Sequence, residues 1–339
     1  MVQPDQAVAS RQPALSYQHR QRSHSNSAEI AQTPAGLIPT PLTATSATAA
    51  ARDSFQRYYE EAGPDYAAWS PHFNMHFGFF RWGMNPFRRE AMLEQMNLEI
   101  LRRFHLDPEL DHDPSAPNRV LDMGCGLSAT LRAFARRLPR ADLHGITLVP
   151  WQLEQGRHLN QSSPETSRIT LALGDYEHTT YPSASFDAVY AIESSCYAHG
   201  ANKSAFLHEA HRLLRTGGRI VVADGFLGPG KLRGPQKSIF RRLCDSWVID
   251  TLGEVAPFTR ELERIGFRDI VVEYKQWRVT PSVLHVPWVT LKFLLTNVAF
   301  GERKMTRARW NNILAPILLP FVGFPVGPMA YYIVSATRA

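Results

Sequence analysis

The residues best placed to do chemistry follow a short apolar run at 119–123, which is typical of a buried strand. Two glycines, Gly124 and Gly126, come directly after this run. Glycine allows positive φ and a close approach of backbone to a ligand. Asp122 lies two residues before the first glycine. Because a carboxylate there would repel a pyrophosphate and attract a cation, the turn predicts a site for a small, positively charged ligand.

The spacing Gly124-x-Gly126-x-x-Ala129 also fits a dinucleotide-binding turn, so a nicotinamide-dependent oxidoreductase is an alternative. That class needs an acid for the ribose about 20 residues further along the chain. Here the second predicted strand ends in Gly145-Ile146-Thr147-Leu148, which contains no acid. The missing carboxylate argues against the oxidoreductase.

The elements around this turn alternate between strands and helices. Further strands are predicted at 142–148, 169–174, 186–192, 219–224, 267–274 and 331–337, and helices at 129–138, 151–160 and 204–214, the last stopped by Gly217-Gly218. This alternation predicts an α/β fold with a doubly wound, Rossmann-like parallel sheet. Ligands of such sheets bind at the carboxyl ends of the strands. The site should therefore collect the Gly124 turn, Thr147, Asp175, Glu193 and Asp224.

The stretch Val120 to Ala129 resembles the first motif of the class I S-adenosylmethionine-dependent methyltransferases. Gly174-Asp175-Tyr176 and residues 215–219 look like later motifs of that family, and the strands 267–274 and 331–337 resemble its antiparallel terminal pair. The resemblance implies S-adenosylmethionine as cofactor. By the same resemblance, Asp122, Gly124 and Gly126 hold the methionine and ribose part, and the motif of Asp175 and Tyr176 lies at the adenine.

Within that family the chain is similar to the sterol, tocopherol and related small-lipid methyltransferases, through residues 76–80, 145–152 and 191–199. Thr147 stands where most of the family has an acid, which leaves Thr147, Gln152 or a backbone group as the partner of the ribose. The likeness implies methyl transfer to carbon or oxygen of an isoprenoid, a sterol-like molecule or a phenolic lipid. The alternatives are an O- or N-methyltransferase of a natural-product scaffold and a non-catalytic, membrane-associated module that binds the cofactor.

Three residues are candidates for catalysis. Glu193 ends an apolar strand, where a carboxylate can hold a sulfonium donor or accept a proton, or can be a buried, paired acid. His199 is a second candidate base, and Asp224 could orient it. Carbon methylation needs a base after attack, which suits Glu193 or His199. Oxygen methylation needs a base before attack, which suits His199 with Asp224.

Aromatic residues near the N-terminus and after the fourth strand are candidates for the substrate site. Their rings can pack in a core or stabilise a cationic group. The candidates are Tyr58, Tyr59, Tyr66, Trp69, His76 and Tyr197.

The composition and the extent of the resemblance divide the chain into five expected parts. Residues 1–50 are predicted to be a disordered tail, because they cannot bury enough apolar surface to fold. Residues 51–107 form a helical cap, 119–275 the cofactor-binding core, 276–330 an apolar insertion and 331–339 the last strand of the core. The tail lacks the apolar stretch of a secretory signal, so a cytoplasmic location is expected, with an organelle transit peptide as the less favoured alternative.

Charge and cysteine content limit the classes of partner and metal that are expected. Residues 231–310 contain 15 Lys and Arg against 8 Asp and Glu, whereas the rest of the chain contains 22 and 23. This basic part predicts a solvated face or contact with anionic headgroups through 276–330. No nucleic-acid motif accompanies the charge. Cys125, Cys196 and Cys244 form no metal-binding pattern, so no metal site is expected, and nothing predicts an oligomeric state.

Overall fold

The computed structural model describes residues 46–106, 117–228, 232–298, 303–322 and 328–339. The expected tail lies outside these residues up to position 45. Helix α1 (Ser46–Ala62) begins inside the last five residues that the sequence assigned to that tail. The cap therefore starts earlier than expected.

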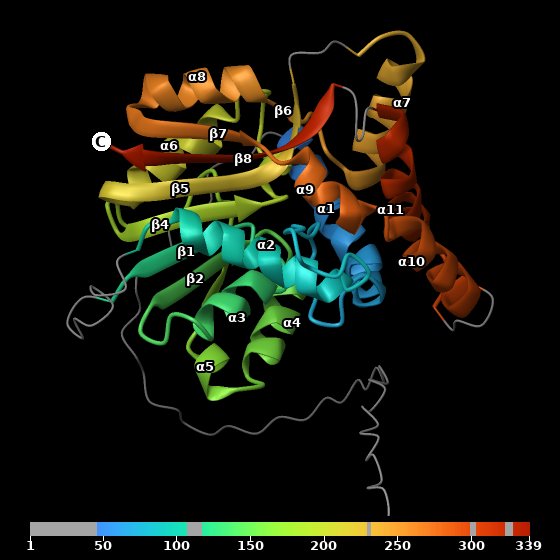
Figure 1. Cartoon of the computed structure of the whole chain (residues 1–339), viewed down its shortest axis with the longest axis horizontal. Helices are drawn as coiled ribbons and strands as arrows, with labels where there is room; N and C mark the ends of the chain where they lie inside the picture. Colours follow the sequence, from blue (N-terminus) through green and yellow to red (C-terminus); the bar gives the residue numbers. More distant parts are fainter. Residues whose placement is uncertain (1–45, 107–116, 229–231, 299–302, 323–327) are drawn as a thin grey trace, which may run out of the picture. The chain divides into compact units, whose positions relative to one another are not determined.

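An eight-stranded sheet forms the centre of the fold, in the order β3-β2-β1-β4-β5-β8-β7, with β6 paired to β5 (Figure 1). Its strands are β1 (Arg119–Met123), β2 (Asp142–Thr147), β3 (Thr170–Leu173), β4 (Phe186–Ile192), β5 (Leu214–Leu227), β6 (Gly253–Glu254), β7 (Phe267–Tyr274) and β8 (Met329–Arg338). Strands β1 to β6 pair in parallel, and β8 runs antiparallel between β5 and β7. The predicted fold class is confirmed.

Alternate residues of the central strands face opposite layers of helices. Val120 and Tyr190 pack in the core under α2 (Arg89–Arg103) and α3 (Ala129–Ala135). Leu121 and Val189 pack on the other face, under α6 (Ser204–Leu213) and α8 (Val255–Ile265). Both faces are therefore buried, which explains why the strands read as continuous apolar runs. The remaining core helices are α4 (Pro150–Asn160) and α5 (Pro164–Ser167).

The junction between α6 and β5 differs from the prediction. The helix ends at Leu213 and β5 begins at Leu214, so Gly217 and Gly218 lie within the strand rather than stopping the helix. The pairing of β4 with β5 shifts register at this point, and Gly217 has φ of +80°. The strand is also longer than predicted because β8 pairs with it from Arg219 to Leu227.

Two groups of helices meet at the carboxyl ends of the parallel strands, and α2, in the first group, also packs over one face of the sheet (Figure 1). The cap consists of α1, η1 (Gly63–Ala68) and α2, with irregular chain between η1 and α2. The second group is α7 (Pro235–Trp247), α9 (Gln276–Val283), α10 (Val286–Phe293), η4 (Leu294–Val298), α11 (Arg307–Leu318) and η5 (Leu319–Val322), and η3 (Ser195–Tyr197) follows β4. Helix α11 packs against α7, α1 and α10 (Figure 1). In the described part of the chain, no helix is long and apolar enough to cross a membrane.

Candidate active site

The turn after β1 has the conformation that its glycines predict. Gly124 has φ of +111° and Gly126 has φ of +50°. The Gly124 and Cys125 amides both donate to the carbonyl of Ile146 at the end of β2, at 3.1 and 3.0 Å. A Cβ at position 124 would lie 2.5 Å from the Cβ of Ser194. Only glycine therefore fits here, and the turn is a cradle that a side chain would fill.

Asp122 lies behind this turn and is only 4% exposed. Burial raises the pKa of its carboxyl group to about 7, because a charge is poorly solvated there. A cationic ligand beside it would favour the charged form. The turn and Asp122 thus fit a cofactor that carries positive charge, as the resemblance implies for S-adenosylmethionine.

The other predicted cofactor residues lie at the same edge of the sheet. Thr147 Oγ1 donates to Gln152 Oε1 at 2.6 Å, so the two side chains that were predicted as partners of the ribose are hydrogen-bonded to each other. Tyr176 is buried beside Gly124, and its hydroxyl donates to the carbonyl of Ser194 at 2.8 Å. Asp175 Oδ1 accepts from the amide of Glu177 at 2.9 Å.

Helix α1 supplies contacts at this edge that the sequence analysis missed. Arg52 Nη2 lies 3.3 Å from Asp175 Oδ2, and Gln56 Nε2 donates to the carbonyl of Leu148 at 2.7 Å. The cap is thereby joined to the ends of β2 and β3. No local signal marks Arg52 or Gln56, since both read as ordinary polar positions of a helix.

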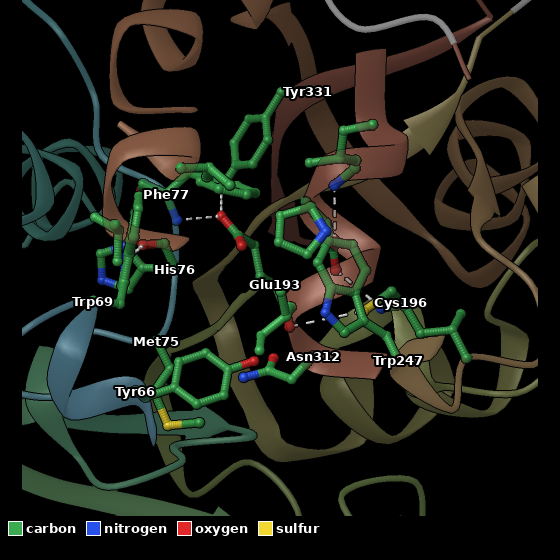
Figure 2. Close-up of a pocket in the computed structure, with 18 of the residues that line it drawn as sticks. Tyr66, Trp69, Met75, His76, Phe77, Glu193, Cys196, Trp247, Asn312 and Tyr331 are labelled. Atoms are coloured by element: carbon green, nitrogen blue, oxygen red, sulfur yellow. Dashed lines mark hydrogen bonds between the residues drawn. The ribbon is translucent and has the colours of Figure 1, made fainter. Parts of the chain in front are cut away.

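A cavity lies beside the glycine turn, between the two helical groups and the ends of β4, β5 and β8. Its volume is about 190 Å³, which is room for an organic molecule rather than a single water. The lining is mostly aromatic and aliphatic, with few polar groups (Figure 2). The aromatic members are Tyr59, Tyr66, Trp69, Phe77, Tyr197, Trp247, Phe293 and Tyr331.

Glu193 directs its carboxylate into this cavity, as Figure 2 shows. It follows β4 with φ of +49°, and its amide donates to the carbonyl of Ala223 at 2.8 Å. Its Oε1 accepts from the amide of Phe77 at 2.8 Å and from the hydroxyl of Tyr331 at 3.0 Å. Burial raises the pKa of the carboxyl group to about 8. A carboxylate in this setting can stabilise a cation and accept its proton.

Glu193 also lies next to the glycine turn. Ser194 follows it in sequence and contacts the turn: its Oγ donates to the carbonyl of Met123 at 2.7 Å. Met75 lines the cavity, and its sulfur lies 3.4 Å from where a Cβ of Gly126 would be. Met75 and the adjacent residues Glu193 and Ser194 therefore link the cavity to the turn, so a ligand on the turn and one in the cavity would be neighbours.

The structure does not bring His199 and Asp224 together, which corrects the expected pairing. Asp224 is buried, and its carboxylate accepts from the Ser195 hydroxyl at 2.7 Å and from the amides of Cys196 and Gly225 at 2.9 and 2.8 Å. It thus orders the loop after β4. The side chain of His199 is 71% exposed, is outside the cavity lining and contacts Glu177, which raises the pKa of the imidazole.

Most of the predicted substrate residues reach the cavity. Tyr59, Tyr66, Trp69, His76 and Tyr197 line it, and the hydroxyls of Tyr59 and Tyr197 are 2.9 Å apart. Tyr58 is outside the cavity lining; its hydroxyl donates to Asn312 Oδ1 at 3.0 Å.

His76 has a ring that is tied to the fold on both sides. Its Nδ1 lies 2.9 Å from the carbonyl of Phe77 and its Nε2 lies 3.0 Å from Asn97 Oδ1. Burial lowers the pKa of this imidazole. The geometry therefore suits a structural role: His76 orients the backbone of Phe77, whose amide donates to Glu193.

Several cavity residues were not predicted. Tyr331, Asn312 and Trp247 line the cavity together with the sulfur-bearing Met75 and Cys196 (Figure 2). Tyr331 is the first residue of the strand expected at 331–337, and nothing in the local pattern marks its hydroxyl. Asn312 and Trp247 belong to helices α11 and α7, which the sequence analysis did not predict.

Comparison with known proteins agrees with this geometry. The model of a methyltransferase domain family matches residues 120–218. A probable chloroplastic tocopherol O-methyltransferase of Oryza sativa subsp. japonica is 25% identical over 290 residues, which is 83% of this chain and 76% of the relative. The methyltransferase GfsG of Streptomyces halstedii is 31% identical over 222 residues, which is 63% of this chain and 74% of the relative.

A solved structure shows the same fold. The geranyl diphosphate C-methyltransferase from Streptomyces coelicolor A3(2), in complex with Mg²⁺, geranyl diphosphate and S-adenosyl-L-homocysteine, has a TM-score of 0.61 at 12% identity, covering 85% of this chain and 98% of that chain. The similarity in sequence, the strand order and the glycine turn all indicate the same family. The chain belongs to the class I S-adenosylmethionine-dependent methyltransferases, and S-adenosylmethionine is its cofactor.

Proposed function

We propose that the enzyme transfers a methyl group to a carbon atom of an unsaturated, apolar small molecule, of isoprenoid, sterol-like or phenolic-lipid type, held in the cavity. S-adenosylmethionine supplies the activated methyl group. The glycine turn, Asp122 and the edge formed by Thr147, Gln152, Asp175 and Tyr176 would hold it. The largely apolar lining of the cavity would hold the acceptor and exclude water.

The observation that carries this proposal is the position of Glu193. A carbon acceptor becomes positively charged when its π electrons form the new bond to the methyl group, and it must then lose a proton. The Glu193 carboxylate can stabilise that charge and take the proton. Tyr331 and the Phe77 amide hold the carboxylate in place. Because this proton leaves only after attack, no separate base is needed beforehand.

Oxygen methylation of a phenol is the second candidate, and its support is the similarity to a probable tocopherol O-methyltransferase. A phenol must be deprotonated before or during attack, and the predicted base for that step was His199. Its imidazole contacts Glu177, outside the cavity lining. The expected histidine base is therefore away from the cavity, and a phenol would depend on the carboxylates of Glu193 and Asp224, which line it.

The test is a product analysis with the full chain and cofactor that carries a CD₃ methyl group. Candidate acceptors are an acyclic isoprenoid alkene, a sterol with an unsaturated side chain and a prenylated hydroquinone. We expect mass spectrometry to show the gain of one CD₃ group, and NMR to place it on carbon. Label on oxygen would support the second candidate. Cofactor binding without any product would favour the non-catalytic module.

Replacing Glu193 tests the mechanism directly. Glu193→Gln keeps the size of the side chain but cannot accept the proton, so we expect kcat to fall about 100-fold or more while cofactor affinity stays within about twofold. Glu263→Gln, the same change at an exposed position of α8, is the matched control. Full activity of Glu193→Gln would contradict the role of this carboxylate.

A further inference from the structure

An exposed apolar stripe runs along the helical segment 276–298. Its members are Trp277, Leu284, Trp288, Leu291, Leu295 and Val298, each between 41% and 71% exposed. Their spacing alternates between three and four residues from Leu284 onward, and Trp277 lies seven residues before Leu284. Side chains at this spacing share one face of an α-helix, which applies to the members up to Leu291; Leu295 and Val298 lie in the π-helical turn that follows, Leu294–Val298. The backbone of Leu284 and His285, between α9 and α10, is also helical, so the run is nearly continuous.

The opposite face of α10 is apolar as well. Val286 and Phe293 are buried, and together with Val289 and Thr290 they line the cavity. A surface helix normally turns polar side chains toward water. Helix α10 instead has apolar side chains on both sides, and an exposed apolar face of this kind marks an interaction surface. A partner on this face would be separated from the cavity by α10.

The charges around the stripe indicate what the partner is. From Lys275 to Val298 the chain contains no acid, and Lys292 lies within the stripe's helix. Arg309 lies over the ring of Phe293, 5.7 Å from its centre, which brings the start of α11 to the end of α10. Lys304 and Arg307 there are exposed. This positive charge is complementary to anionic lipid headgroups, whereas a second copy would oppose like charges.

The two tryptophans of the stripe also favour a lipid bilayer as the partner. Trp288 is 66% exposed and Trp277 is 59% exposed. Indole rings are enriched at the boundary between lipid and water, because they combine a large apolar area with one polar N–H group. A stripe of tryptophan and leucine bordered by Lys and Arg is the pattern of a helix that lies in the interface of a bilayer rather than across it.

We propose that the stripe docks the enzyme on an anionic lipid bilayer, with α9 and α10 parallel to its surface. The docking itself requires neither cofactor nor acceptor. It places the substrate cavity one helix away from the bilayer, which is where an apolar acceptor accumulates; that consequence rests on the proposed function.

The first experiment measures sedimentation of the full chain with vesicles of phosphatidylcholine, with and without phosphatidylglycerol. We expect binding to the anionic vesicles, weakened by added salt. Trp288→Ser with Leu291→Ser should reduce binding about tenfold or more, since both lose apolar burial. Lys292→Glu should also reduce it. The matched controls are Val271→Ser, an exposed apolar residue on β7, and Arg136→Glu, both expected to bind like the unaltered chain.

The second experiment locates the contact. The native cysteines are buried, so a thiol-reactive, environment-sensitive fluorophore labels an introduced one selectively. On Leu291→Cys the emission should shift to the blue with anionic vesicles, and on Val271→Cys it should not. Unaltered urea midpoints would show that the variants fold.

Absence of vesicle binding would overturn the proposal. So would binding that the stripe variants leave unchanged. A third contrary result is a dimer in analytical ultracentrifugation that the Leu291→Ser variant abolishes, with no binding to vesicles. Since neither assay contains cofactor or acceptor, failure of methyl transfer would not be mistaken for failure of docking.

Discussion

Asp122 and Glu193 are carboxyl groups whose charged forms the protein disfavours until a positive group is near. Burial raises the pKa of Asp122 to about 7 and that of Glu193 to about 8. One lies behind the glycine turn and the other faces the cavity. A cation bound beside either group favours its ionised form, and Glu193 must already be ionised when methyl transfer begins if it is to take the proton afterwards. This makes pH a direct probe of their roles.

Cofactor binding should depend on pH through Asp122. Its pKa is raised in the free protein, so below about pH 7 the group is protonated and offers no negative charge to the cofactor. Affinity should therefore rise with pH toward 7, by up to about tenfold per pH unit, with release of one proton. Calorimetry in buffers of different ionisation enthalpy measures both the affinity and the number of protons released. Asp122→Asn should bind more weakly and without this pH dependence; equal affinity at pH 5.5 and 7.5 in the unaltered enzyme would contradict the assignment.

Tyr331 should set the pH at which Glu193 works. Its hydroxyl donates to the carboxylate and so favours the charged form, which lowers the pKa from the still higher value that burial alone would produce. Tyr331→Phe removes that bond. We expect the rising limb of kcat against pH to move to higher pH, with a several-fold loss near neutrality that recovers in alkali. Tyr332→Phe, whose ring packs on Phe226 and Tyr274, is the control; identical pH profiles for both variants would rule out this role.

At the scale of elements, a buried lysine helps Asp224 to hold the loop between β4 and α6. Lys203 Nζ donates to the carbonyls of Cys196, Ala198 and Thr251 at 3.1, 2.7 and 2.8 Å. Cys196 and Tyr197 on this loop line the cavity. The position of the cavity wall therefore depends on an ammonium group that is completely buried.

Lys203→Met should show that dependence. The methionine fills similar space but leaves three carbonyl groups without their donor, so we expect the free energy of unfolding to fall by about 2–5 kcal/mol. Urea denaturation measures it. The exposed Lys237→Met on α7 is the matched control and should change stability by less than about 0.5 kcal/mol. A similarly small loss for Lys203→Met would mean that the loop is held by other contacts.

At the scale of the whole molecule, a buried ion pair joins the cap to the insertion. Arg309 on α11 is 1% exposed and contacts Asp65 of η1 through Nε–Oδ2 at 2.7 Å and Nη2–Oδ1 at 3.0 Å. Arg303 Nη1 lies 2.9 Å from the same carboxylate. Asp65 also lines the cavity. The pair therefore closes one side of the substrate site with segments that are 244 residues apart in sequence.

Replacing only Arg309 should destabilise the fold more than replacing both residues of this ion pair. Arg309→Met leaves the buried Asp65 carboxylate without its main partner, so we expect the free energy of unfolding to fall by about 3–5 kcal/mol. Adding Asp65→Asn should restore part of the loss, because the stranded charge disappears. A double-mutant cycle in urea measures the coupling. Strictly additive losses would show that the two side chains stabilise the fold independently.

The glycine turn, Asp122 and the strands of the core were predicted from sequence because their signals are local. Apolar runs of a few residues specify buried strands, and positive φ selects glycine whatever lies elsewhere in the chain. The order of strands also restricted the site to their carboxyl ends, which is where Glu193 and Asp175 lie. The α6–β5 junction was mispredicted because Leu214 pairs with Phe186 of β4, a contact that no local pattern shows, so that β5 begins before the two glycines.

The contacts that define chemistry in the cavity could only be seen in the tertiary structure. Glu193 is bonded to Phe77 and Tyr331, which lie 116 and 138 residues away in sequence. The predicted base His199 lies six residues from Glu193, yet it contacts Glu177 outside the cavity lining. Residue types and spacing along the chain determine which groups are able to react. Which of them face one another depends on how distant segments pack, and no local pattern contains that information.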